Sequence, residues 1–187
     1  MAKAFRELIG VGPSTASTKD SVLIIIDAQN EYAKGHLKTE NVASTRKAIS
    51  TLLEKYRAAS APLVHTIHQT PPRAPVFTPD TDLAKKFSEF SPKGEKSLAS
   101  KHLFLKSTGK NKLVLTDDMA HVCVSTMARQ AAEKGYDVLI AEDPVGDRNI
   151  PDVDGEQLVR MALVELTEAF GTVKKSSCIN LVARVSF

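Results

Sequence analysis

Short apolar runs alternate with longer stretches of helical periodicity along most of this chain. The runs are continuous rather than alternating with polar residues, which is typical of strands buried on both faces of a parallel sheet. Strands are predicted at residues 22–26, 63–67, 112–116, 137–141 and 170–173. The stretches between them carry apolar residues three and four positions apart, as in helices that bury one face. Helices are predicted at residues 42–59, 122–134 and 156–170, with a shorter one at 82–90.

Strands that alternate with crossover helices predict the fold class. We expect an α/β protein, a three-layer α/β/α sandwich around a mostly parallel, Rossmann-like doubly wound sheet. The length of 187 residues suits one domain with a sizeable core. Residues 1–187 are therefore predicted to form a single domain, in which residues 1–20 are an irregular N-terminal arm. Residues 70–79 contain four prolines and are predicted to be a loop.

Composition and charge narrow the classes of function. The 25 Lys and Arg residues against 22 Asp and Glu give a net charge of +3, and the basic residues are scattered. Without a basic stripe, nucleic-acid binding is not expected. No apolar stretch reaches the ~18 residues that span a bilayer, and residues 1–12 lack the apolar core of a signal peptide. We predict a cytoplasmic protein with a small-molecule substrate; export without a signal peptide stays open as an alternative.

The two cysteines are Cys123 and Cys178. A disulfide between them is one alternative, but a domain of this size does not need one, and the lack of a signal peptide favours reduced thiols. Cys123 falls at the predicted start of a helix, where the helix dipole stabilises a thiolate and free backbone N–H groups can stabilise an oxyanion. We therefore expect a depressed thiol pKa and faster alkylation at Cys123 than at Cys178.

Sites in parallel α/β sheets form at the carboxyl ends of the strands. This rule selects Asp27 after the first strand, residues 117–123 after the third and residues 142–148 after the fourth. A carboxylate at the end of a buried strand is partly desolvated, which suits Asp27 to general acid/base catalysis. Alternatively, Asp27 caps a helix or turn or pairs with a nearby lysine, and Cys123 serves as a small buried apolar residue.

The histidines and glycines give no metal or cofactor signal. His65 and His68 are predicted to point to opposite faces, with no carboxylate or cysteine nearby to complete a site. Neither G-x-G-x-x-G nor G-x-x-x-x-G-K-[ST] occurs, so no nucleotide-binding loop is indicated. We predict no metal and no cofactor.

Four segments form a specific combination when taken in order. They are VLIIIDAQNE at 22–31, KLVLT at 112–116 followed by MAHVCVST at 119–126, ARQAAEKGYDV at 128–138, and AEDPVGDR at 141–148. This combination resembles the isochorismatase-like cysteine hydrolase superfamily over roughly residues 20–175. The resemblance implies a catalytic triad, with Asp27 as general base and acid, Cys123 as nucleophile and Lys101 as the cation that lowers the thiol pKa.

The resemblance also implies features of the turn before Cys123. The backbone N–H groups of Met119 and Cys123 would line an oxyanion hole, after a cis peptide bond just before Met119. We further expect Gln29 and His121 to bind substrate. Family members are usually dimers or larger, and residues 76–77 and 181–187 offer apolar surface, so we predict a homo-oligomer.

The resemblance leaves two chemistries open. Siderophore-type isochorismatases cleave a vinyl ether and release pyruvate, with the aspartate as proton donor, whereas amidase-type members form a thioester on the cysteine. Cys123 favours the second, and the turn Met119-Ala-His121 resembles that of true isochorismatases. The predicted function is therefore a hydrolase that acts on isochorismate or a small amide. Asp117, where the family has Gly, and the short segment after Lys101 favour the alternative of a catalytically silent binding protein.

Overall fold

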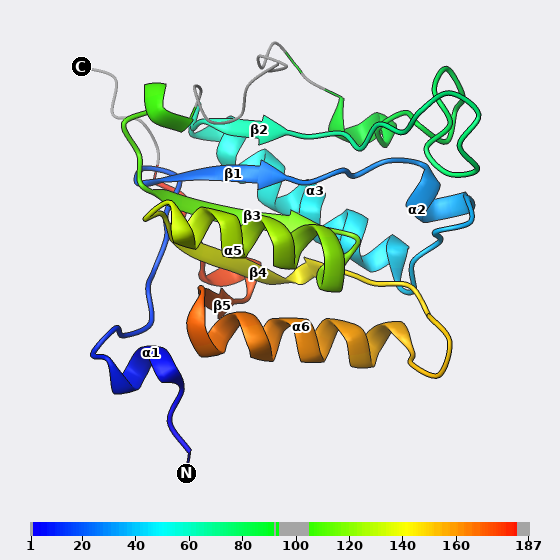
Figure 1. Cartoon of the computed structure of the whole chain (residues 1–187). Helices are drawn as coiled ribbons and strands as arrows, with labels where there is room; N and C mark the ends of the chain where they lie inside the picture. The colour runs from blue at the N-terminus through cyan, green and yellow to red at the C-terminus, as the bar shows by residue number, and fades with distance from the viewer. Residues whose placement is uncertain (1, 92, 94–104, 183–187) are drawn as a thin grey trace.

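The structure is a computed structural model and describes residues 2–91, 93 and 105–182. Parallel strands form its centre (Figure 1). They are β1 (Ser21–Ile25), β2 (Leu63–His65), β3 (Lys112–Asp117), β4 (Asp137–Val145) and β5 (Thr172–Lys174). The order in the sheet is β2-β1-β3-β4-β5, and each neighbouring pair is parallel. The predicted α/β class is confirmed.

Helices cover both faces of the sheet. Helix α3 (Val42–Ala58) lies on one face, and α5 (Ser125–Glu133) and α6 (Gly155–Ala169) lie on the other (Figure 1). Helix α5 ends where its periodicity predicts, because Gly135 adopts a φ of +80° and donates its N–H to Ala132. Asp154 begins α6 by accepting a hydrogen bond from the Gln157 N–H at 2.7 Å.

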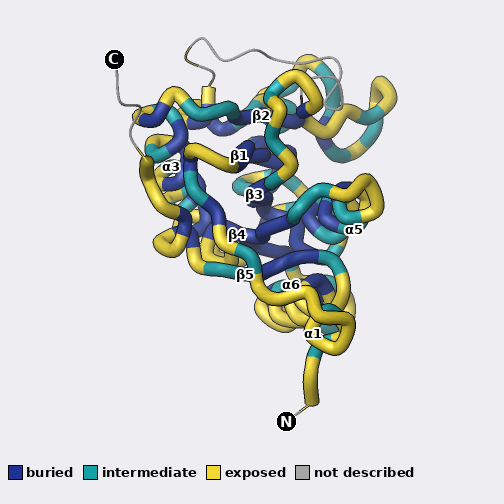
Figure 2. Tube along the Cα trace, turned by 90° about the vertical axis from the view of Figure 1, so that its left-hand side faces the viewer, coloured by how far each residue is buried: buried dark blue, intermediate teal, exposed yellow. Residues whose placement is uncertain are grey.

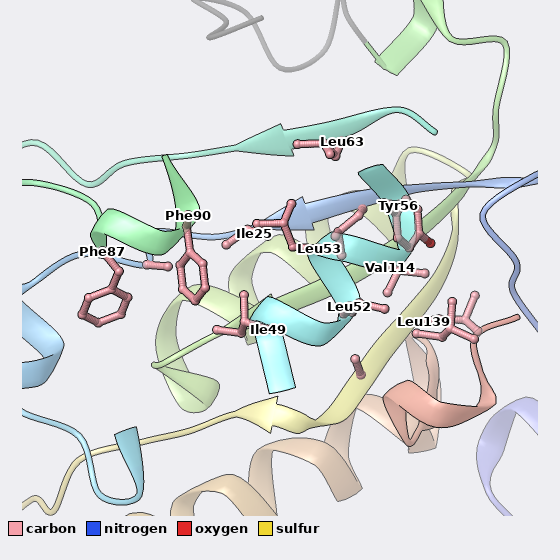
Figure 3. Close-up of a cluster of buried hydrophobic side chains, with 14 of the residues drawn as sticks. Ile25, Ile49, Leu52, Leu53, Tyr56, Leu63, Phe87, Phe90, Val114 and Leu139 are labelled. Atoms are coloured by element: carbon pink, nitrogen blue, oxygen red, sulfur yellow. The ribbon is translucent and has the colours of Figure 1, made fainter. Parts of the chain in front are cut away.

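Successive residues of each strand pack against opposite layers. Leu23 and Ile25 of β1 join the cluster under α3, whereas Ile24 joins the cluster under α5 and α6. Figure 3 shows the first cluster, in which Leu52 and Leu53 of α3 face the sheet. Because both faces are covered, the strands form the buried centre of the molecule (Figure 2).

Two local predictions need correction, and one short helix was not predicted. The N-terminal arm is not wholly irregular, since Phe5–Leu8 form the single helical turn α1. Residues 82–90 form only a short 3₁₀ helix, Ser88–Phe90, because the preceding residues bond to the chain after β1 instead: the Asn30 N–H donates to Lys85 and the Phe87 N–H to Ala28. The four-residue helix α2 (Glu31–Lys34) was not predicted, since it is too short to carry helical periodicity.

The apolar surface expected at residues 76–77 is largely absent. Phe77 is 3% exposed and packs edge-on against Tyr32, at 5.4 Å between ring centroids. Leu181 and Val182 are exposed as expected. In the described ranges no helix has both the length and the apolar character needed to cross a membrane.

A homo-oligomer stays a prediction, carried now by Leu181 and Val182 and by the exposed apolar side chains of α1. Light scattering at about 10 μM protein is expected to give the mass of a dimer or larger, because such apolar patches are usually covered by a partner. A monomer mass at that concentration would refute the prediction. A variant with both Leu181→Ser and Val182→Ser tests whether this surface forms the contact between copies of the chain.

Candidate active site

The order of the strands decides where the site forms. The order 2-1-3-4-5 reverses direction between β1 and β3, and ligands of such sheets bind at that point, outside the carboxyl ends. Asp27 follows β1, and Asp117 ends β3. The register pairs Ile25 with Thr116, and the Ile26 N–H donates to the Thr116 carbonyl at 2.9 Å. The two carboxyl groups therefore leave neighbouring strands at the same edge of the sheet.

Asp27 is held rigidly by Thr66. The Thr66 hydroxyl donates to Asp27 Oδ1 at 2.7 Å and accepts the Asp27 N–H at 3.1 Å. Asp27 is 7% exposed and has a φ of +46°, a left-handed conformation that aspartate tolerates better than most residues. The turn away from β1 thus points a desolvated, oriented carboxyl group into the edge where the site is expected.

Cys123 does not lie in the first turn of an α-helix. It belongs to the π-helical turn η2 (Ala120–Val124), which precedes α5. Its N–H donates to the Met119 carbonyl at 3.1 Å, and the same carbonyl accepts the Val124 N–H at 3.2 Å. The Cys123 N–H is therefore already bonded, and the predicted oxyanion hole of Met119 and Cys123 would require that bond to lengthen.

The thiol of Cys123 lies among acidic groups. The Tyr32 hydroxyl lies 3.9 Å from Sγ, and the charges of Asp117 and Asp27 act on the thiol. Burial, followed by the charges of Asp117 and Asp27, raises the pKa of Cys123 to about 12. The predicted depressed pKa is wrong, because burial and neighbouring carboxyl groups outweigh any effect of the helix dipole.

Alkylation of the native protein tests this correction. Both cysteines are free, as expected for reduced thiols, and Cys178 is exposed whereas Cys123 is partly buried. With iodoacetamide at about pH 7, Cys178 is expected to label first, because the Cys123 thiol is both less accessible and less ionised. Intact-mass analysis with Cys178→Ala and Cys123→Ala as controls would identify the site, and faster labelling of Cys123 would contradict the structure.

Asp117, the last residue of β3, and Asp118, which follows it, are both fully buried. Asp117 Oδ1 accepts the Asp118 N–H at 2.7 Å, and burial, with the charges of Asp27, Asp118 and Asp147, holds the pKa of Asp117 well above its usual range. Asp118 Oδ1 accepts the Thr45 hydroxyl at 2.5 Å, and burial raises the pKa of Asp118 to about 6. Of the two aspartates, Asp117 is the one whose charge interacts with Asp27 and with the Cys123 thiol.

The other residues predicted for the site do not share one outcome. Lys101 lies outside the described residues. The peptide bond before Met119 is not cis, nor is any other in the described ranges, so that expectation is wrong. Gln29 is fully buried; its amide donates to the His68 and Ala84 carbonyls and accepts the His68 N–H. A substrate contact by Gln29 stays a prediction and would need one of these bonds to break.

His121 is held by a buried carboxylate. Its Nδ1 lies 2.7 Å from Asp147 Oδ2, which also accepts the His121 N–H at 3.0 Å. The ring is partly exposed, so its other nitrogen can serve a ligand, and substrate binding by His121 stays a prediction. Over the described part of the chain, no group of three or more His, Cys, Asp or Glu side chains is placed to hold a metal ion.

Sequence reasoning missed Tyr32, Thr66 and Asp147. Thr66 follows β2 at the carboxyl edge and could have been found by the same rule that selected Asp27. Asp147 lies within residues 142–148, which that rule selected without choosing among them. Tyr32 gave no signal, because its position depends on the short helix α2 and on packing against Phe77.

The structure is an α/β protein with a cysteine and two carboxyl groups at the switch point of a parallel sheet. Comparison with known proteins agrees. The isochorismatase domain model matches residues 21–177. The secreted isochorismatase effector Isc1 of Verticillium dahliae is 54% identical over 95% of this chain and 99% of its own length. The chain belongs to the isochorismatase family, and the predicted superfamily is confirmed.

Two further relatives extend the comparison. The isochorismatase-like protein asqB of Emericella nidulans is 38% identical over 92% of this chain and 81% of its own length. The crystal structure of an isochorismatase from Pseudomonas putida superposes with a TM-score of 0.87 at 25% identity, and covers 96% of this chain and 100% of that chain. The likeness thus extends over nearly the whole chain in both sequence and fold.

Proposed function

We propose that this protein hydrolyses the vinyl ether of isochorismate, with Asp27 as the proton donor. The observation that carries the proposal is the placement of two buried carboxyl groups, Asp27 and Asp117, near the Cys123 thiol, whose pKa is raised by burial and by their charges. A buried, oriented carboxyl group beside a thiol that ionises only at high pH suits acid-catalysed cleavage better than nucleophilic attack. The name of the Verticillium dahliae relative, an isochorismatase effector, supports the same activity.

The chemistry follows from the position of the Asp27 carboxyl group. Asp27 donates its proton to the methylene carbon of the vinyl ether, and the ether carbon takes up positive charge. Water adds to that carbon, and the resulting hemiketal collapses to pyruvate and an alcohol. The Asp27 carboxylate left behind stabilises the positive charge, and it recovers a proton as water adds. Thr66 keeps Asp27 oriented through both steps.

Thioester chemistry at Cys123 is the second candidate, because the cysteine is present and the Asp27 carboxyl group is near enough to act on its pKa. With the pKa of the thiol raised to about 12, the thiolate is scarce at pH 7. Catalytic cysteines ordinarily have a pKa of about 3.5–7.5. Amide hydrolysis would therefore depend on a cation brought to the thiol, and Lys101 is the residue proposed for that role.

The wild-type protein separates these alternatives directly. Incubation with isochorismate is expected to release pyruvate, and incubation with a panel of small amides is expected to release no ammonia. Ammonia release without pyruvate would favour the thioester route. Turnover of neither class would favour the silent binding protein, whose ligand binding can then be measured by calorimetry with isochorismate.

Whether the protein acts inside or outside the cell is a separate question. The cytoplasmic location stays a prediction, whereas the description of the Verticillium dahliae relative as secreted favours export. A homo-oligomer without nucleic-acid or membrane partners completes the proposal.

A further inference from the structure

One phenol hydroxyl at the site is buried against sulfur. Tyr32 is 1% exposed, and its hydroxyl lies 3.9 Å from Cys123 Sγ. Among the described residues this hydroxyl has no oxygen or nitrogen partner. A thiol is only a weak donor and a weak acceptor, whereas a buried tyrosine hydroxyl ordinarily finds a strong partner. The Tyr32 hydroxyl is therefore a donor that the protein itself uses only weakly.

The ring of Tyr32 is fixed in place. Phe77 packs edge-on against it at 5.4 Å between ring centroids, and the Tyr32 carbonyl accepts the Thr39 N–H at 2.9 Å. Glu31 of α2 is 0% exposed and accepts the Phe77 N–H at 3.3 Å, which ties the loop that carries Phe77 to α2. The hydroxyl hydrogen can still turn about the C–O bond. It can therefore leave the sulfur for another acceptor without movement of the ring.

Two other donors beside the thiol are already bonded. The Thr66 hydroxyl donates to Asp27 Oδ1 at 2.7 Å, and the Cys123 N–H donates to the Met119 carbonyl at 3.1 Å. Burial raises the pKa of the Tyr32 hydroxyl, and the charges of neighbouring acidic groups raise it further, so this hydroxyl keeps its proton at neutral pH. An anionic oxygen that reaches the thiol would therefore find in Tyr32 a neutral donor among acidic groups.

The substrate of the proposed reaction carries such an oxygen. Pyruvate leaves with a carboxylate, so in the substrate the ether carbon bears that carboxylate next to the methylene carbon that Asp27 protonates. We propose that Tyr32 is a substrate-binding residue whose hydroxyl donates a hydrogen bond to this carboxylate. The inference rests on the proposed function, which brings the methylene carbon to Asp27. Because Cys123 is partly exposed, a ligand that reaches its thiol also comes close to the hydroxyl, 3.9 Å from Sγ.

Tyr56 provides a matched control for Tyr32. It is 0% exposed, and its hydroxyl lies 2.6 Å from the hydroxyl of Ser21, which begins β1 at the end opposite to Asp27. Each change of tyrosine to phenylalanine removes one hydroxyl and keeps the ring. Because Tyr56→Phe breaks the stronger hydrogen bond, it should lower the melting temperature more than Tyr32→Phe does. A change in binding seen in Tyr32→Phe alone therefore reports on the site rather than on stability.

Steady-state kinetics of pyruvate release test the inference. Tyr32→Phe is expected to raise KM for isochorismate by about 10–100-fold, as for one lost hydrogen bond to a charged group. The value of kcat should stay within about threefold, because Asp27 still supplies the proton. Tyr56→Phe should leave both constants unchanged. An unchanged KM in Tyr32→Phe, with or without a fall in kcat, would contradict the inference.

Pyruvate is a probe that needs no turnover, since it carries the same carboxylate. Its Kd, measured by NMR titration, should rise in Tyr32→Phe by a similar factor and stay unchanged in Tyr56→Phe. Equal Kd values for the wild type and Tyr32→Phe, or a wild type that does not bind pyruvate, would overturn the inference. Absence of pyruvate release from the wild type would contradict the proposed function instead, and the pyruvate titration then decides the inference by itself.

Discussion

Replacing Asp27 by Asn is expected to lower kcat for pyruvate release by about 10²–10⁴-fold, the range typical of a lost general acid. Asn has nearly the same shape and can still accept the Thr66 hydroxyl at its oxygen, so the turn after β1 should keep its geometry. It cannot supply a proton to carbon. The effect should therefore fall on kcat at saturating isochorismate, with KM and the melting temperature changed little.

Thr66→Ser is the matched control for Asp27→Asn. The serine hydroxyl can make both hydrogen bonds that orient Asp27, so turnover should stay within about tenfold of the wild type. If Asp27→Asn keeps near-normal turnover on a substrate that the wild type hydrolyses, the assignment of the acid is wrong. The end of β1 would then no longer be the catalytic position.

Cys123→Ala is expected to separate the two chemistries. Any amide hydrolysis should fall by about 10⁴-fold or more, because the nucleophile is gone. Pyruvate release should persist within about tenfold, because the thiol forms no bond to the substrate in vinyl ether cleavage. Initial rates with both substrate classes measure the difference. Cys178→Ala, which alters an exposed thiol in η3 (Ser176–Cys178), should leave both rates unchanged.

Loss of pyruvate release in Cys123→Ala would place the thiol in the reaction. The proposal that the thiol forms no bond to the substrate during vinyl ether cleavage would then be wrong. Thermal unfolding controls for packing, since Cys123 contacts both apolar clusters of the core.

The position of the site was predictable because it depends on the order of elements. A continuous apolar strand followed directly by Asp27, and a third strand followed by residues 117–123, suffice once the sheet is parallel. The adjacency of β1 and β3 then brings these segments together, as the register of Ile25 with Thr116 confirms. Neither inference needed contacts between distant side chains.

The electrostatics of the site could not be predicted in the same way. Whether Cys123 begins an α-helix or lies in a π-helical turn depends on tertiary contacts, such as the hydrogen bond from the Ala120 N–H to the Gly146 carbonyl. The raised pKa of its thiol depends on burial and on Asp117, whose neighbours come from β1 and from the loop after β4. Periodicity records which residues are buried but not which charges they meet.

In the proposed reaction Asp27 performs the chemistry as an acid while Cys123 remains a thiol. The ratio of kcat for pyruvate release between Cys123→Ala and Asp27→Asn, measured side by side with isochorismate, tests it most directly. Cys123→Ala is expected to be faster than Asp27→Asn by about tenfold or more. A ratio at or below one would contradict it.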